Sequence, residues 1–315
     1  MYSIGIDLGG TNIAVGVIDG NNKIIGRGKE KTFSERTAEE IFASMAKAVE
    51  SAMHDAGITV EDVKSIGIGT PGSVDKENGI IVYANNLDFH NVPARELLKK
   101  YFDVDIYIDN DANCAALGEA VAGAGEGKKN FVAVTLGTGV GSGLIVDGKI
   151  VTGCNDAGGE CGHMVIMLDG EECTCGRKGC WEAYASATAL IKQTKRAMLD
   201  DKASLMWKLC GENIDAVSGR TAFDAMRKGD KTAKEVVNRY LEYVSVGTVN
   251  LVNALQPDVL CFGGGICNEG DTLLDPIREY VKRERYSKYA EKQTVICRAL
   301  LGNDAGIIGA ALLDR

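Results

Sequence analysis

The chain has 315 residues, of which 45% are hydrophobic and 25% are charged, as in globular proteins large enough for two domains. A net charge of −9 and a pI of about 5.1 argue against a surface made for nucleic acid or anionic membranes. No apolar run reaches the roughly 18 residues that span a bilayer, and the N-terminus lacks the features of a signal peptide. We therefore expect a cytoplasmic protein in which most of the scattered cysteines are buried thiols.

Apolar runs separated by glycine-rich turns predict alternating strands and helices. Three strands, at 2–7, 13–19 and 24–31, open the chain. A helix over 37–57 follows, in which Thr37 and Glu40 have capping-box spacing and Gly57 is a natural C-terminal stop. Further strands are expected at 64–69, 105–111, 131–139, 141–149, 258–266 and 294–300, and helices at 93–102, at 112–122, through most of the segment after Tyr184, and from Asp304.

The first hairpin recurs 128 residues later. Leu8-Gly9 falls on Leu136-Gly137, and residues 17–20 fall on 145–148. Coincidence between two glycine-rich hairpins is one explanation, because such hairpins share turn chemistry. The interpretation that we favour is a duplicated half-domain, whose two glycine turns would face each other across a cleft and bind a polyphosphate through backbone amides.

Glycine turns follow apolar strands at 7–12, 136–143 and 262–266. The chain has no P-loop motif and no strict dinucleotide-binding G-x-G-x-x-G after a strand. Three such turns suit a nucleotide held by loops from two lobes, since glycine lets backbone approach a ligand closely. Asp7 follows a buried strand and is placed to orient Mg²⁺ through water, with an Asx-turn role as the alternative.

Another apolar strand ends in Asp109-Asn110-Asp111, and a helix begins at once. Active sites of α/β proteins lie at the carboxyl ends of strands. Phosphoryl transfer to an alcohol needs a base that accepts the hydroxyl proton, and we assign this role to Asp111 with Asn110 beside it. The alternative is that one of these residues merely caps the helix.

The stretch CTCGRKGCWE at 173–182 contains three cysteines, and a histidine lies ten residues before the first of them. His163, Cys173, Cys175 and Cys180 form a Cys₃His set, the ligand count of a closed structural zinc site, with buried thiols as the alternative. Such a zinc would fix Glu160 and Glu182 on either side of it, as acceptors for the hydroxyls of a polyol. His163 has a second ring nitrogen that could donate a hydrogen bond.

The chain resembles the ROK sugar kinases (repressors, open reading frames and kinases) of the actin-like ATPase superfamily. The resemblance covers essentially the whole chain, through DLGGTN (7–12), GTPG (69–72), DNDANCAALGE (109–119), LGTGVGSG (136–143), GGECGHM (158–164), CTCGRKGCWE (173–182) and FGGG (262–265). The cysteine motif with its upstream Gly-His is highly specific, and the glycine loops are less so. Many members have isoleucine where this chain has Cys161, which we interpret as a neutral substitution pointing into the core.

The resemblance implies an α/β, two-lobed actin-like ATPase (ribonuclease H-like) fold of duplicated mixed-sheet domains with a cleft between them. It implies Asp111 as the catalytic base, zinc at the Cys₃His set, ATP and Mg²⁺ as cofactors, and homodimers or homotetramers. The implied sugar ligands are Asn86, Asn110, Asp111, Glu160, His163 and Glu182. The implied nucleotide ligands are Asp7, Gly9, Gly10, Thr11, Asn12, Gly137, Thr138 and Gly139 near the phosphates, and Gly264 and Gly265 near the adenosine.

The expected activity is that of a glucokinase, forming glucose 6-phosphate and ADP from glucose and ATP. Kinases for N-acetylmannosamine, N-acetylglucosamine, fructose or allose are alternatives within the same chemistry, as is polyphosphate as a second donor. A DNA-binding repressor of the family is disfavoured, because the first strand begins at Tyr2 and leaves no room for a helix-turn-helix domain. We expect a small lobe of residues 1–115 plus 302–315, and a large lobe of 116–301 with the zinc loop at 160–182.

Overall fold

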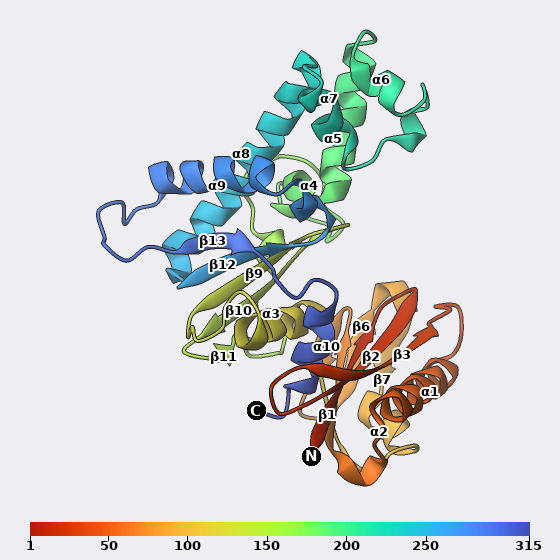
Figure 1. The fold of residues 1–315 in the computed structure, drawn as a ribbon. Helices are drawn as coiled ribbons and strands as arrows, with labels where there is room; N and C mark the ends of the chain where they lie inside the picture. Colours follow the sequence, from red (N-terminus) through yellow and green to blue (C-terminus); the bar gives the residue numbers. More distant parts are fainter. The chain divides into compact units, whose positions relative to one another are not determined.

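The computed structural model describes residues 1–315, and two of its sheets have five strands each (Figure 1). The first sheet has the order β3-β2-β1-β4-β8. Its strands are β1 (Tyr2–Leu8), β2 (Asn12–Ile18), β3 (Ile24–Lys31), β4 (Val63–Thr70) and β8 (Asp105–Asn110). The hairpin strands β1, β2 and β3 pair antiparallel, whereas β4 pairs parallel to both β1 and β8.

The second sheet repeats this order as β11-β10-β9-β12-β13. Its strands are β9 (Phe131–Leu136), β10 (Val140–Val146), β11 (Lys149–Ile150), β12 (Val259–Gly263) and β13 (Val295–Arg298). A shift of 128 residues carries the bounds of β2 onto those of β10, and β12 pairs parallel to β13 as β4 does to β8. The recurring hairpin of the sequence is therefore a repeated structural unit, and the expectation of duplication is confirmed.

A third sheet, of order β5-β6-β7, was not expected from the sequence. It consists of β5 (Ser73–Asp75), β6 (Ile80–Ala84) and β7 (Phe89–Val92). These strands are short and separated by tight turns, so they give little periodic signal. The sheet matters for the site because the 3₁₀ turn η2 (Asn85–Leu87) lies between β6 and β7.

The helices largely follow the expected pattern. They are α1 (Ala38–Ala56), α2 (Ala94–Lys99), α3 (Asp111–Ala122), α4 (Glu182–Ala185), α5 (Ala187–Asp200), α6 (Leu205–Leu209), α7 (Thr221–Arg227), α8 (Lys231–Leu255), α9 (Asp271–Glu284) and α10 (Asp304–Ala311). Thr37 caps α1 in a full capping box with Glu40, and Gly57 ends the helix at φ 67°. None of these helices combines the length and the hydropathy that crossing a membrane requires.

The chain forms two compact units, one of Met1–Ala133, Gly143–Gly159 and Ala299–Arg315, the other of Val134–Ser142 and Glu160–Arg298. The terminal helix α10 packs on β1 and β4, as expected, and also on α3. This packing is close, because a Cβ on Gly5 would lie 1.8 Å from the Ile307 carbonyl oxygen. Since α3 packs against α10, the first unit extends beyond residue 115, where the sequence placed the end of the small lobe.

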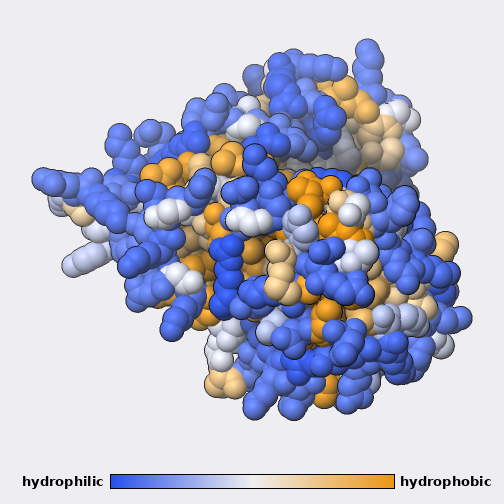
Figure 2. Space-filling model, turned by 60° about the horizontal axis from the view of Figure 1, so that its bottom comes forward, coloured by the Kyte–Doolittle hydropathy of each residue, from blue (hydrophilic) through white to orange (hydrophobic).

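The core of the first unit is built from the buried aliphatic residues of its sheet and of α1, including Ile4, Ile6 and Phe42. Of the scattered cysteines, Cys114, Cys161, Cys210, Cys261 and Cys267 are buried, and none of them forms a disulfide. Cys154 is exposed, so it departs from the expectation of a buried thiol. The face drawn in Figure 2 is mostly hydrophilic, as expected for a globular protein with 25% charged residues.

Candidate active site

In the first unit, three parallel-paired strands end at one edge of the sheet. Asp7 of β1 lies in register with Gly69 of β4, and Gly69 lies in register with Asp109 of β8. Parallel strands place their carboxyl ends together, which is where α/β proteins bind their ligands. The sheet thus gathers Asp7 and the Asp109-Asn110-Asp111 run at the same edge.

Asn110 and Asp111 occupy the junction of β8 and α3. Asn110 is the N-cap of α3, and its Oδ1 accepts from the amides of Ala112 at 2.8 Å and Asn113 at 3.3 Å. Its Nδ2 donates to the Gly72 carbonyl oxygen at 3.0 Å. Asp111 is exposed at the first position of α3. The capping alternative therefore holds for Asn110. The cap is thus supplied by Asn110, and Asp111 is exposed at the carboxyl end of β8.

Asp7 is a carboxylate in an environment that disfavours its charge. Burial, and then the negative charge of Asp111, raise the pKa of Asp7 from 3.8 to about 6. Neighbouring carboxylates repel each other electrostatically. Such pairs are common at functional sites that bind a cation, either alone or together with a polyphosphate.

The glycine turn after β1 is closed by its own backbone. The Gly9 amide donates to the Asn12 carbonyl oxygen at 2.9 Å, and the Thr32 amide donates to the Thr11 carbonyl oxygen at 3.1 Å. Asn86, in η2, lies against this turn, because a Cβ on Gly10 would be 3.3 Å from the Asn86 Nδ2. The structure therefore brings an expected sugar ligand next to the expected phosphate turn.

The second unit contains the equivalent turn after β9. The Gly137 amide donates to the Gly139 carbonyl oxygen at 3.0 Å, and Thr138 is exposed at the tip. Gly264, at φ 90°, follows β12 and lies so near β9 that a Cβ there would be 2.4 Å from the Leu136 carbonyl oxygen. Gly265 begins the 3₁₀ turn η5 (Gly265–Glu269). Two of the three glycine turns thus lie together in this unit.

Glu182 connects the zinc loop to this turn. Its Oε2 accepts from the Val140 amide at 2.9 Å, and its Oε1 accepts from the Thr174 hydroxyl at 3.3 Å. Glu182 is the first residue of α4 and follows Trp181, which is buried and donates from Nε1 to the Tyr243 carbonyl oxygen at 2.9 Å. The sequence did not single out Trp181 as the anchor of Glu182.

The Cys₃His residues converge. The candidate ligand atoms of His163, Cys173, Cys175 and Cys180 all lie within 4.8 Å of one another. His163 Nδ1 is 3.6 Å from Cys173 Sγ, and the Sγ atoms of Cys175 and Cys180 are 3.7 Å apart. A tetrahedral site with metal–sulfur bonds of about 2.3 Å has sulfurs about 3.7 Å apart, so the residues fit a zinc ion. Burial raises the pKa of the Cys180 thiol, a cost that metal coordination removes by stabilising the thiolate.

The loop around these four residues is held mainly by backbone hydrogen bonds. The Cys173 amide donates to the Arg177 carbonyl oxygen at 2.8 Å, and Val165 bridges Cys180 in antiparallel fashion. Glu160 is exposed and precedes the 3₁₀ turn η3 (Cys161–His163). In that turn, Cys161 is buried and its amide donates to Ser142 Oγ at 3.1 Å, which agrees with the expectation of a core position.

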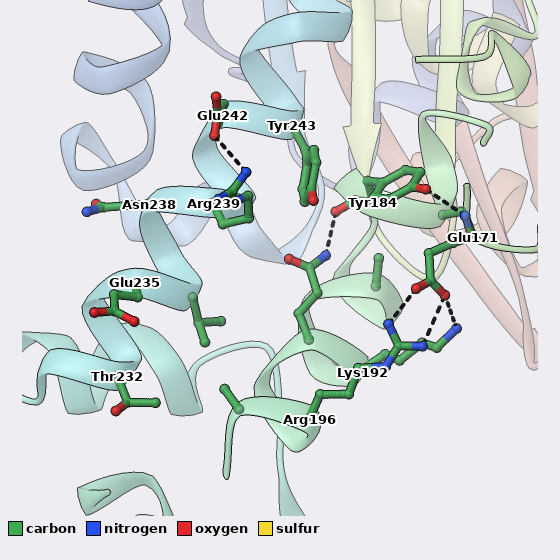
Figure 3. A pocket seen from close by; sticks show the side chains of 15 residues that line it. Glu171, Tyr184, Lys192, Arg196, Thr232, Glu235, Asn238, Arg239, Glu242 and Tyr243 are labelled. Atoms are coloured by element: carbon green, nitrogen blue, oxygen red, sulfur yellow. Dashed lines mark hydrogen bonds and ion pairs between the residues drawn. The ribbon is translucent and has the colours of Figure 1, made fainter. Parts of the chain in front are cut away.

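A separate pocket of about 630 Å³ lies between α5 and α8 in the second unit (Figure 3). None of the site residues expected from the sequence lines it. At one end, the carboxylate of Glu171 in the zinc loop pairs with Lys192 and Arg196 of α5. These ion pairs lower the pKa of Glu171 to about 2, chiefly through Arg196. We interpret this end of the pocket as an attachment of the zinc loop to α5, which the sequence did not reveal.

Comparison with known proteins matches a model of the ROK family to residues 3–315. The glucokinase of Thermotoga maritima is 36% identical over 315 residues, which are 99% of this chain and 96% of that relative. A ROK family glucokinase from Streptomyces griseus, solved with glucose and AMPPNP, is 33% identical with a TM-score of 0.81 and covers 99% of each chain. The ROK hexokinase of Thermus thermophilus is 33% identical with a TM-score of 0.82, over 99% of this chain and 97% of that one.

The sequence matches and the structural matches both cover nearly the whole chain. They confirm the expected actin-like ATPase fold, since the solved relatives superpose over almost the whole chain. The family model and a full-length relative above 30% identity agree. The chain belongs to the ROK family.

Proposed function

We propose that this protein is an ATP-dependent glucokinase that transfers the γ-phosphate of ATP to the 6-hydroxyl of glucose. The observation that carries the proposal is the exposed Asp111 at the strand edge of the first unit, beside the capping Asn110. It is supported by the full-length similarity to glucokinases and by the relative solved with glucose and an ATP analogue.

In this reaction Asp111 acts as the general base. Its carboxylate accepts the proton of the 6-hydroxyl while O6 bonds to the γ-phosphorus, and the bond from that phosphorus to the β–γ bridging oxygen breaks to release ADP. The backbone of α3 orients the base, because the Ala112 amide donates to Asp111 Oδ1 at 2.8 Å. Little other covalent chemistry is required of the protein, so positioning of the two substrates supplies most of the rate.

The sugar is held by residues that can accept or donate hydrogen bonds to its hydroxyls. We assign this role to Asn86, Asn110, Asp111, Glu160, His163 and Glu182. A zinc ion bound by the Cys₃His set would have four protein ligands and no open position, so its contribution is to hold the loop that carries Glu182. With Nδ1 of His163 nearest the cysteines, Nε2 is the nitrogen left for the sugar.

The nucleotide is assigned to the glycine turns. Gly9, Gly10, Thr11 and Asn12 of the first unit, and Gly137, Thr138 and Gly139 of the second, offer backbone amides and hydroxyls to the phosphates. Gly264 and Gly265 are assigned to the adenosine. Mg²⁺, when bound with ATP, neutralises phosphate charge, and Asp7 is placed to orient it through water.

For the assembly and the compartment, we propose a homodimer or homotetramer in the cytoplasm. Ten cysteines without a disulfide, two of them exposed, suit a reducing compartment in which ATP and glucose are both available. The partners are then small molecules and copies of the same chain.

The experiment that tests the proposed reaction is identification of the product. Purified protein with Mg-ATP and glucose should yield ADP and a phosphate monoester on O6 of the sugar, which ³¹P and ¹H NMR distinguish from phosphate on O1. Free phosphate formed at the same rate without sugar would reveal an ATPase and contradict the proposal.

A further inference from the structure

Asp109 directly precedes Asn110 and the proposed base, Asp111, and its carboxyl group is fully buried. It is 0% exposed, and it accepts from the Asn110 amide at 2.7 Å and from Asn113 Nδ2 at 2.9 Å. A buried carboxylate is costly unless its charge is paired. The partner is Lys76, whose Nζ donates to Asp109 Oδ2.

Lys76 is itself fixed by its backbone. Its carbonyl oxygen accepts from Arg95 Nη2 at 2.8 Å, while Arg95 Nε donates to the Ile106 carbonyl oxygen of β8 at 3.0 Å. Its amide donates to Asp156 Oδ2 at 3.2 Å. The ammonium group is therefore presented from a turn that is tied to the same strand that carries Asp109.

The segment from Gly72 to Lys76 contacts the strand end twice. Gly72 accepts from Asn110 Nδ2 at 3.0 Å, and Lys76 pairs with Asp109 one residue earlier. Asp109 in turn holds the Asn110 amide, and Asn110 caps the helix that begins at Asp111. A chain of contacts thus runs from Lys76 to the position of the proposed base.

Lys76 and the nearby carboxylates also affect the pKa of one buried group, the thiol of Cys114. Burial raises the pKa of the Cys114 thiol, and the negative charges of Asp109, Asp111 and Asp7 raise it further, whereas Lys76 lowers it. Lys76 and the three carboxylates therefore act with opposite sign on the same buried thiol. Removing Lys76 would leave the buried carboxyl group of Asp109 without its cationic partner, beside the residues assigned to the sugar.

We infer that Lys76 is a positioning residue for phosphoryl transfer, which pairs with the buried Asp109 carboxyl group and so fixes Asn110 and the start of α3 for catalysis. The inference rests on the proposed function, because it assigns Asn110 and Asp111 to the sugar. Its effect should be local, since Lys76 acts through one carboxylate at one strand end.

The test compares Lys76→Met with Lys64→Met. Lys64 is an exposed lysine of the same unit that pairs with Asp314 at 2.8 Å, so it controls for loss of a lysine ion pair. Lys76→Met should lower kcat by about 10- to 100-fold and raise KM for glucose, with KM for ATP within about twofold of wild type. Lys64→Met should match wild type in kcat, in KM for glucose and in KM for ATP.

Two further variants separate positioning from charge loss alone. Lys76→Arg keeps a cation and should recover part of the kcat, although guanidinium and ammonium geometries differ. Replacing the pair with Asp109→Asn and Lys76→Met together removes the unpaired buried charge, so the double variant should be more active than Lys76→Met.

Amide hydrogen exchange gives a readout that does not depend on activity. In Lys76→Met, the amides of residues 110–113 should exchange about tenfold faster or more, while the rest of the first unit is unchanged. Wild-type kinetics and exchange in Lys76→Met would overturn the inference, as would faster exchange throughout the unit. If wild-type protein phosphorylates no sugar, the proposed function fails, while exchange still decides whether Lys76 orders this strand end.

Discussion

Glu182 Oε2 accepts a hydrogen bond from the Val140 amide at 2.9 Å. This bond joins a residue assigned to the sugar to the glycine turn assigned to the ATP phosphates. The turn makes room for the carboxylate, since a Cβ on Gly139 would lie 2.2 Å from Glu182 Oε2. Glycine at 139 thus leaves the space that the Glu182 carboxylate occupies, and a Cβ there would make this side chain move.

The first prediction concerns this contact. Gly139→Ala should displace Glu182 and weaken glucose binding by about tenfold or more, because a displaced side chain loses its aligned hydrogen bonds. Gly137→Ala is the matched control, since a Cβ at that position would meet nothing within 4 Å. Calorimetric titration with glucose in the absence of nucleotide measures both variants. Equal glucose affinity in the two would show that Glu182 does not bind the sugar in this position.

The second prediction concerns the base. Asp111→Asn keeps the size of the side chain but cannot accept the hydroxyl proton, so turnover should fall by about 10²- to 10⁴-fold. Glucose should still bind, because an amide can replace a carboxylate in most hydrogen bonds to hydroxyls. The measurements are initial rates of ADP release and glucose titration. Turnover near that of wild type would remove Asp111 from the mechanism.

A third prediction concerns the metal. Cys175→Ser, or chelation, should lower the unfolding temperature by several degrees and weaken glucose binding at the same time, because a zinc ion held by the Cys₃His set would fix the loop that carries Glu182. The control is Cys154→Ser, which replaces an exposed cysteine outside the cluster. Elemental analysis should find one zinc per chain in wild type and in the control. A zinc-free preparation with unaltered stability and sugar affinity would refute this role.

The fourth prediction uses the raised pKa of Asp7. Because the pKa rises from 3.8 in the unfolded chain to about 6 in the fold, the folded state prefers the protonated carboxyl. This preference stabilises the fold below about pH 4 and is lost as the pH rises through 6, at a cost of up to about 3 kcal/mol near pH 7. Asp7→Asn should therefore raise the free energy of unfolding near pH 7 by about 1–3 kcal/mol, with a gain that shrinks toward pH 4.

Replacing Asp19 with asparagine should have the opposite effect on the free energy of unfolding. The Lys23 amide and other donors lower the pKa of Asp19, so its ionised form is favoured by the fold, and Asp19→Asn should destabilise near neutral pH. Urea unfolding of both variants at about pH 4.5 and about pH 7.5 checks the pair. If the gain in free energy of unfolding for Asp7→Asn does not change with pH, the pKa of the Asp7 carboxyl is not raised in the fold.

The elements predictable from the sequence are those with strong local signals. The capping box of α1, the repeated hairpin and the strand-to-helix junction at Asp111 follow from capping chemistry and period-two patterns, and each is present. The Cys₃His set was predictable because ligand type and count suffice to suggest zinc, whatever the loop geometry.

The remaining features depend on contacts between distant residues. The pairing of Lys76 with Asp109 joins residues 33 positions apart, and nothing in the spacing of either residue marks it. The attachment of Glu171 to α5 and the burial of Trp181 beside Glu182 likewise arise from tertiary packing. The limits of the units also depended on the packing of α3 against α10, which local patterns do not encode.

The most direct test of the central claim is the rate of ADP release with Mg-ATP across glucose, N-acetylmannosamine, N-acetylglucosamine, fructose and allose. A glucokinase should act on glucose faster than on each of the others by about tenfold or more, a difference of roughly 1.4 kcal/mol in transition-state stabilisation. A rate highest on an acetamido sugar would contradict the assignment of glucose, and no sugar-dependent ADP release at all would contradict the assignment as a kinase.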